Sequence, residues 1–120
     1  MNVLYKQIIN GIEYLVCLAP HEYLKKEMTG NENSKQEYYG FHYSRKRLII
    51  IADDLDEEQA VRTYAHEYTH AHRFCLGYDT QNDSIDEEAL CDYIMMNYET
   101  IYHMAEHFRK HIKEHIDKQD

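Results

Sequence analysis

The segment His66-Glu67-Tyr68-Thr69-His70 holds the residues whose types and spacing could carry out chemistry in this chain. Side chains four residues apart lie on one face of an α-helix, so the imidazoles of His66 and His70 could reach a single metal ion. Glu67 lies one step round the helix, where its carboxylate could contact a metal-bound water rather than the metal. Two imidazoles, one further ligand and an open position are typical of a catalytic zinc site. The segment therefore predicts a Zn²⁺ site with Glu67 beside the metal-bound water.

A third ligand is available on a second predicted helix further along the chain. Glu88 and Asp92 stand four residues apart in Glu88-Ala89-Leu90-Cys91-Asp92-Tyr93-Ile94-Met95-Met96, a stretch that is apolar on most sides. Buried carboxylates are costly unless they are paired or bind a metal. We expect Glu88 to ligate zinc, and Asp92 to accept the free N–H of a ligand histidine and so fix its orientation. Glu87 remains an alternative ligand, although the cap predicted at Ser84 would engage its side chain.

Histidine is abundant here, nine in all, so an HExxH match is weak evidence when it stands alone. The inverted pattern HxxEH occurs twice near the C-terminus, at 103–107 and 111–115, where a solvated polar helix face is the favoured interpretation. His66 and His70 themselves face away from the apolar stripe of their helix. They are either solvated or turned into a cleft that the second helix closes. The cleft is favoured because it gives Glu88 and Asp92 partners.

The first half of the sequence predicts strands and one short helix. Asn10-Gly11 supplies the positive φ angles of a type I′ turn, which predicts a hairpin of strands 3–9 and 12–18. Pro20 suits the first turn of a helix at 20–28. A polar loop should follow at 29–36, and then two strands near 36–43 and 47–52. The continuous apolar run Leu48-Ile49-Ile50-Ile51 is typical of a strand covered on both faces.

The second half predicts two helices. Asp54-x-x-Glu57 can form a capping box, and an apolar stripe then runs to a helix end near Gly77. After a loop, Ser84-x-x-Glu87 can cap a second helix at 85–116, bent near Asn97. The expected fold is α+β: one domain, 1–120, with an antiparallel or mixed sheet packed on the HExxH helix and on a long C-terminal helix.

Composition excludes several classes of function. Thirteen Lys and Arg against 22 Asp and Glu give a net charge of −9, which disfavours binding to nucleic acid. No apolar run reaches the roughly 18 residues of a membrane span. Polar residues interrupt the N-terminal stretch, so no secretory signal is expected. Three unpatterned cysteines indicate reduced thiols and a cytoplasmic location. The sequence leaves the oligomeric state open.

Residues 48–96 resemble the core of the gluzincin metallopeptidases, in which a strand, an HExxH helix and a glutamate helix follow one another. Glu88-Ala89-Leu90-Cys91-Asp92 is similar to the ExxxD element of thermolysin-like enzymes, and Thr69-His70-Ala71 resembles the small ImmA/IrrE-type peptidases, or minigluzincins, of phages and mobile elements. The resemblance implies a zincin-like fold and a zinc-dependent peptidase. His66, His70 and Glu88 would then be the ligands, Glu67 the catalytic base and Asp92 the support of a ligand histidine. Leu90 stands where that family usually has Asn or Asp.

The resemblance implies hydrolysis of a peptide bond in a narrow set of protein or peptide targets. A donor to the oxyanion is also expected, and Tyr38, Tyr39, Tyr43 and Tyr93 are equal candidates. Gly40, between aromatic residues, suggests a bulge or a close backbone approach, on a strand edge that could bind an extended substrate. The alternative function is an acidic interaction protein without catalysis, such as an inhibitor or DNA mimic, or a degenerate zincin.

Overall fold

The computed structural model describes residues 1–30, 38–78 and 87–119. Its elements, in chain order, are β1 (Asn2–Ile9), β2 (Ile12–Ala19), α1 (His21–Thr29), β3 (Gly40–Tyr43), β4 (Leu48–Ala52), α2 (Glu57–Cys75) and α3 (Glu87–Lys118). This is the α+β architecture that the sequence predicts. Most of the predicted 29–36 loop, and the predicted cap at Ser84 with its preceding loop, lie outside the described residues.

The four strands form one mixed sheet in the order β1-β2-β4-β3. β1 and β2 are the predicted antiparallel hairpin, and its turn residues Asn10 and Gly11 have φ angles of 47° and 83°, as a type I′ turn requires. β2 pairs with β4 in parallel, and β3 pairs with β4 antiparallel. β3 is therefore an edge strand of the described sheet.

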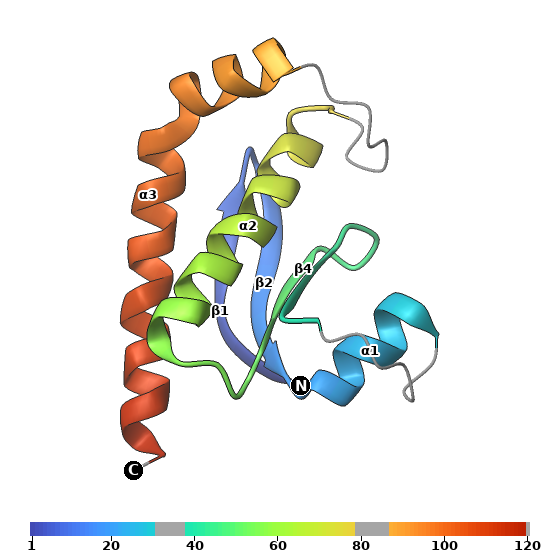
Figure 1. The fold of residues 1–120 in the computed structure, drawn as a ribbon, viewed down its shortest axis with the longest axis vertical. Coiled ribbons are helices and arrows are strands. Elements are labelled where there is room, and N and C mark those ends of the chain that lie inside the picture. Colours follow the sequence, from blue (N-terminus) through green and yellow to red (C-terminus); the bar gives the residue numbers. More distant parts are fainter. Residues whose placement is uncertain (31–37, 79–86, 120) are drawn as a thin grey trace.

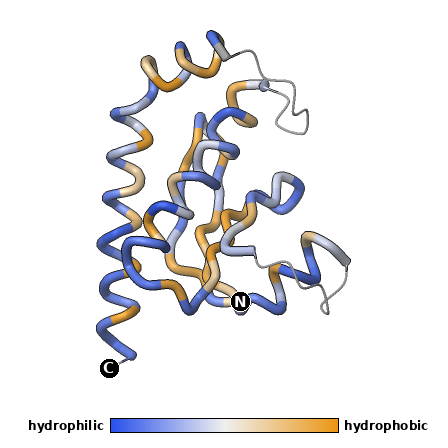
Figure 2. Tube along the Cα trace, in the orientation of Figure 1, coloured by the Kyte–Doolittle hydropathy of each residue, from blue (hydrophilic) through white to orange (hydrophobic). Residues whose placement is uncertain are grey.

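Both faces of the central strands are covered, and β4 is buried along its whole length, as its unbroken apolar sequence predicts. Alternate strand residues, such as Val16 and Ile49, pack with α2 and the C-terminal half of α3. Their neighbours, such as Cys17 and Ile50, pack with α1. Figure 1 shows α2 lying across the sheet with α3 beside it. Figure 2 shows the most apolar segments gathered in the central strands, while α1 is mainly hydrophilic.

The cap of α2 differs from the prediction by two residues. Asp56, not Asp54, is the N-cap, and its carboxylate accepts a hydrogen bond from the backbone N–H of Gln59 at 2.9 Å. Asp54 is engaged elsewhere, because its carboxylate lies 2.6 Å from His21 Nε2 at the start of α1. The helix ends at Cys75 with Gly77 at φ 94°, close to the predicted end.

α3 packs on the core mainly through its C-terminal half. Ala105, Phe108 and Ile112 are buried against α2 and the sheet. The N-terminal half bends away from this line (Figure 1), and Met95 and Met96 there are 62% and 75% exposed. No helix among the described residues has the length and apolar composition that a membrane crossing needs. All three cysteines are free thiols, as predicted.

Candidate metal centre

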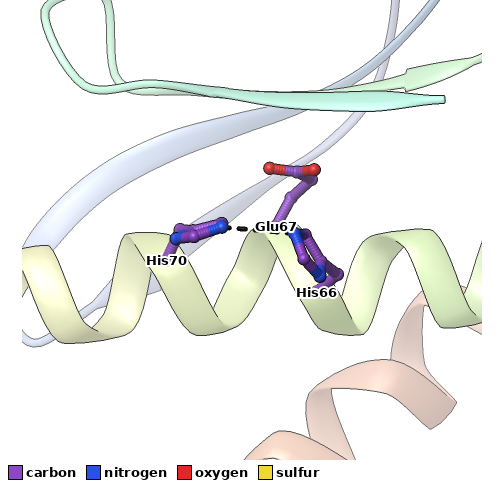
Figure 3. Close-up of side chains that lie close together, drawn as sticks. All are labelled: His66, Glu67 and His70. Carbon is purple, nitrogen blue, oxygen red and sulfur yellow. Dashed lines mark hydrogen bonds between the residues drawn. The ribbon is translucent and has the colours of Figure 1, made fainter. Parts of the chain in front are cut away.

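His66 and His70 converge in the middle of α2. Their Nε2 atoms lie 3.2 Å apart, and Figure 3 shows both rings on one side of the helix. Candidate ligand atoms of His66, Glu67 and His70 all lie within 4.8 Å of one another. No other group of three or more candidate metal ligands is found among the described residues. The helical spacing in the sequence thus brings the predicted pair together.

The geometry of the two imidazoles fits a zinc ion. Two nitrogen ligands at about 2.0–2.1 Å from a tetrahedral zinc are about 3.3–3.4 Å apart, close to the separation seen here. Only a neutral imidazole can coordinate a metal. Burial lowers the pKa of His70, and the neighbouring His66 and Arg73 lower it further, which favours the neutral ring. The donor set of the site therefore suits Zn²⁺.

Glu67 is the buried member of the group, with a side chain 8% exposed. Figure 3 shows its carboxylate directed away from the axis of α2 and towards the edge strand. Burial raises the pKa of Glu67 to about 7, although a hydrogen bond from the backbone N–H of His42 on β3 acts in the opposite direction. The structure gives this carboxylate the surroundings of a general base that is active near neutral pH.

A cavity of about 440 Å³ opens beside this group. One wall is α2, where Arg62 and Thr63 precede His66 and Glu67. The opposite wall is formed by Met28 of α1 and by residues 38–40, which lead into β3. No described residue of α3 lines this cavity, which is enclosed by α2, α1 and the residues that lead into the edge strand. The cleft that the second helix was expected to close stays a prediction.

Glu88 and Asp92 are exposed near the start of α3, so the expectation that their carboxylates are buried is wrong. The stretch that contains them is covered little by the rest of the molecule, although its apolar composition suggested a buried helix. Neither residue belongs to the group formed by His66, Glu67 and His70. Their roles as third ligand and supporting carboxylate remain predictions, as does the alternative Glu87.

The contact between the first turns of α3 and α2 is made by Tyr93. Its hydroxyl lies 2.8 Å from Nδ1 of His72, and both side chains are buried. Sequence reasoning missed this pair, because His72 lies outside the HExxH pattern and its partner is 21 residues away. The hydroxyl of Tyr93 therefore already has a hydrogen-bond partner, His72, which lies two residues after His70. Of the four candidate oxyanion donors, Tyr38 and Tyr39 line the cavity, whereas Tyr43 and Tyr93 do not.

The C-terminal histidines lie along α3, away from the cavity. His103 and His107 are exposed, and His111 and His115 are half-buried. The ring of Tyr5 contacts those of His107 and His111, with centroids 4.9 and 4.3 Å away. These residues contribute to no described group of three candidate ligands. The inverted HxxEH patterns therefore do not assemble a second centre of the HExxH kind in the described residues.

Comparison with known families agrees with this geometry. The sequence profile of the IrrE N-terminal-like domain, the peptidase M78 family, matches residues 23–118, and the chain belongs to this family. The predicted membership of the ImmA/IrrE group is thereby confirmed, and the fold is the small zincin-like α+β domain expected of it. No curated protein and no solved structure matches the chain. Family and geometry together define a protease-like domain of the zinc-dependent type.

Proposed function

We propose that this domain is a zinc-dependent peptidase that hydrolyses peptide bonds in a narrow set of protein or peptide targets. The observation that carries the proposal is the convergence of the His66 and His70 nitrogens next to the buried carboxylate of Glu67, at one end of a cavity. Membership of the peptidase M78 family supports it. His66, His70 and, from the sequence, Glu88 would hold the ion.

In the proposed hydrolysis, the zinc ion and the side chains of the protein would have different roles. Zinc bound there would acidify a water molecule and polarise the carbonyl of the scissile bond. Glu67 would accept the proton of that water and pass it to the leaving amine. Its carboxylate is suited to both steps, because burial keeps its proton affinity high while the backbone N–H of His42 holds its position. Tyr38 and Tyr39 are the candidate oxyanion donors that line the cavity.

An extended substrate could pair with β3. This strand lies at the edge of the described sheet, next to α2, and Tyr39 just before it is 50% exposed. Backbone hydrogen bonds to an open edge bind a peptide in extended form irrespective of its sequence, while pockets select its side chains. One cavity on a small domain offers few such pockets, and this favours a narrow range of targets.

A proteolysis assay tests the proposal. The full chain, loaded with zinc, is incubated with a proteome-derived peptide mixture and with casein, and new termini are identified by mass spectrometry. We expect cleavages that disappear in Glu67→Gln, a variant that should retain its zinc. Zinc binding without cleavage of any peptide or protein would contradict the hydrolytic function and favour a degenerate zincin that only binds partners.

A further inference from the structure

The cavity beside the candidate metal centre contains one cationic side chain, Arg62. It is the only Lys or Arg among the residues that line the cavity, and it lies one helical turn before His66. Its side chain is exposed, and no hydrogen bond or ion pair to it is found in the described part of the chain. A guanidinium that lines a cavity, and that no described acid holds in a hydrogen bond or ion pair, is able to bind an anion from outside the chain.

The nearest acid along the helix, Glu58, is held mainly by another cation: Arg109 is the larger cause of its lowered pKa, and Arg62 is a smaller one. Glu58 lies one turn before Arg62, but the carboxylate of Glu58 contacts Nη1 of Arg109 on α3 at 2.5 Å. Arg109 also lies 3.7 Å from Glu57, so it contacts both acids at the start of α2, and it lies 3.1 Å from Glu106 on its own helix. Among the described residues, no acid is found in a hydrogen bond or ion pair with Arg62, and the closest helical acid, Glu58, pairs with Arg109.

The wall that faces Arg62 is apolar and aromatic. Met28, Tyr38 and Tyr39 form this side, and Tyr39 and Met28 are themselves 50% and 37% exposed. Such a wall suits the aliphatic stem of a side chain, while the guanidinium suits a carboxylate at its end. Arginine and carboxylate form paired, charge-assisted hydrogen bonds, which are stronger than those between neutral groups.

We propose that this cavity binds a carboxylate of the substrate through Arg62, next to the bond that is cleaved. The carboxylate is either that of a Glu or Asp side chain or that of a peptide C-terminus. The inference rests on the proposed peptidase function, because the cavity is continuous with His66 and Glu67. The net charge of −9 does not prevent a carboxylate from binding to Arg62, since salt screens charges beyond about 8 Å at physiological ionic strength.

The first experiment identifies ligands independently of catalysis. A peptide mixture randomised at six positions is passed over immobilised, zinc-loaded Glu67→Gln, and the retained peptides are sequenced. We expect enrichment of Glu or Asp at one position, or of free C-terminal acids over amides. The enrichment should be lost with the double variant Glu67→Gln/Arg62→Gln. Retained peptides that show no carboxylate preference would overturn the proposal.

The second experiment measures turnover with matched peptides built on the best retained sequence. They carry Glu, Gln or Lys at the enriched position and end in either a free acid or an amide. Wild type should cleave the Glu peptide with a kcat/KM about 10-fold above that of the Gln peptide, as expected for one charge-assisted pair. The preference should disappear in Arg62→Gln and shift to Lys in Arg62→Glu. A preference for Glu over Gln in both the acid and the amide peptides identifies the side chain as the bound group. Equal cleavage of the Glu and Gln peptides, with the free acids cleaved faster than the amides in an Arg62-dependent way, identifies the C-terminus.

Arg45→Glu is the matched control. Arg45 is exposed, lies between β3 and β4, and does not line the cavity, but its replacement changes the net charge by the same amount. An equal loss of preference in this variant would overturn the assignment to Arg62. Cleavage without a carboxylate preference would overturn the pocket assignment alone. Arg62-dependent binding without cleavage by wild type would overturn the peptidase function and support the pocket.

Discussion

Gly40 at the start of β3 lies against Glu67 of α2 so closely that a larger residue does not fit. A Cβ atom at position 40 would lie 2.9 Å from Cγ of Glu67 and 2.6 Å from Cγ2 of Thr63. The missing side chain thus allows the edge strand to approach the helix that carries the HExxH pattern. From there the backbone N–H of His42 reaches the carboxylate of Glu67. The sequence predicted a close backbone approach at Gly40, and this is confirmed.

Gly40→Ala should reduce peptidase activity and leave zinc binding intact. The added methyl group must displace Glu67 or the strand, and a shift of about 1 Å in a catalytic group can cost about 100-fold in rate. We expect kcat to fall at least about 10-fold, with one zinc retained by elemental analysis. Gly11→Ala, in the β1–β2 turn away from the cavity, is the control: it also adds a Cβ, which meets nothing within 4 Å. Because Gly11 has a φ of 83°, this change costs stability, and kcat is therefore compared per folded protein. Full activity in Gly40→Ala would contradict the positioning role of this contact.

Glu88→Ala should weaken zinc binding, because the sequence assigns the third ligand to this residue. Removal of even a residue that supports a metal ligand typically costs about 10–100-fold in affinity. The loss of one of three protein ligands should therefore lower the zinc affinity at least about 10-fold, as measured by competition with a chromogenic chelator. Asp92→Asn should have a smaller effect, since Asp92 would only orient a histidine. Glu99→Ala, an exposed acid on the same helix, serves as the control. Unchanged affinity in Glu88→Ala, with a loss in Glu87→Ala, would assign the ligand to Glu87.

Acidification should destabilise the fold through His42. Burial lowers the pKa of His42 to about 4, with a smaller effect from His70, and its Nε2 lies 2.8 Å from the hydroxyl of Tyr14. In the unfolded chain the pKa of histidine is about 6.5, so the unfolded state binds the proton first as the pH falls. Stability linked to this ring is therefore lost between about pH 6.5 and pH 4, by at most about 3 kcal/mol.

Urea unfolding of the metal-free protein measures this effect. The free energy of unfolding of wild type should fall more steeply from pH 7 to pH 4.5 than that of His42→Gln, which cannot bind the proton. The carboxylates and the other histidines titrate in both proteins, so their contribution to the pH dependence cancels in the comparison. Parallel pH profiles for the two proteins would show that His42 is not buried in its neutral form.

Phe108→Ala should detach α3 from the core. Phe108 is fully buried, and its ring stacks on Tyr64 of α2 with centroids 4.6 Å apart. Truncation of a buried phenylalanine costs about 3–5 kcal/mol. Tyr102→Ala on the same helix, where the side chain is 60% exposed, should change stability by less than about 0.5 kcal/mol. Similar urea midpoints for the two variants would contradict the described packing of α3.

The parts of the fold that depend on local sequence were predictable. The Asn10-Gly11 turn, the apolar strand β4 and the pairing of His66 with His70 follow from the spacing of nearby residues. The N-cap of α2 could not be predicted in this way, because Asp54 contacts His21, which lies more than thirty positions earlier in the chain. Pattern alone cannot place such a contact.

The rest of the site depends on how distant segments pack. The burial expected for Glu88 and Asp92 was inferred from apolar neighbours, but burial needs a covering surface, and the first half of α3 has little. The cavity wall of Met28, Tyr38 and Tyr39 comes from segments more than twenty residues before His66. Arg62 was overlooked because a single arginine on a helix carries no signal until its partners are known.

The proposed function requires that His66 and His70 hold one zinc ion and that Glu67 acts on the metal-bound water without ligating the metal. Elemental analysis of the purified full chain after dialysis against buffer with trace zinc tests this most directly. We expect about one zinc per chain in wild type and in Glu67→Gln, and almost none in His66→Ala or His70→Ala. A chain without metal, or zinc that persists when both histidines are replaced, would contradict the account.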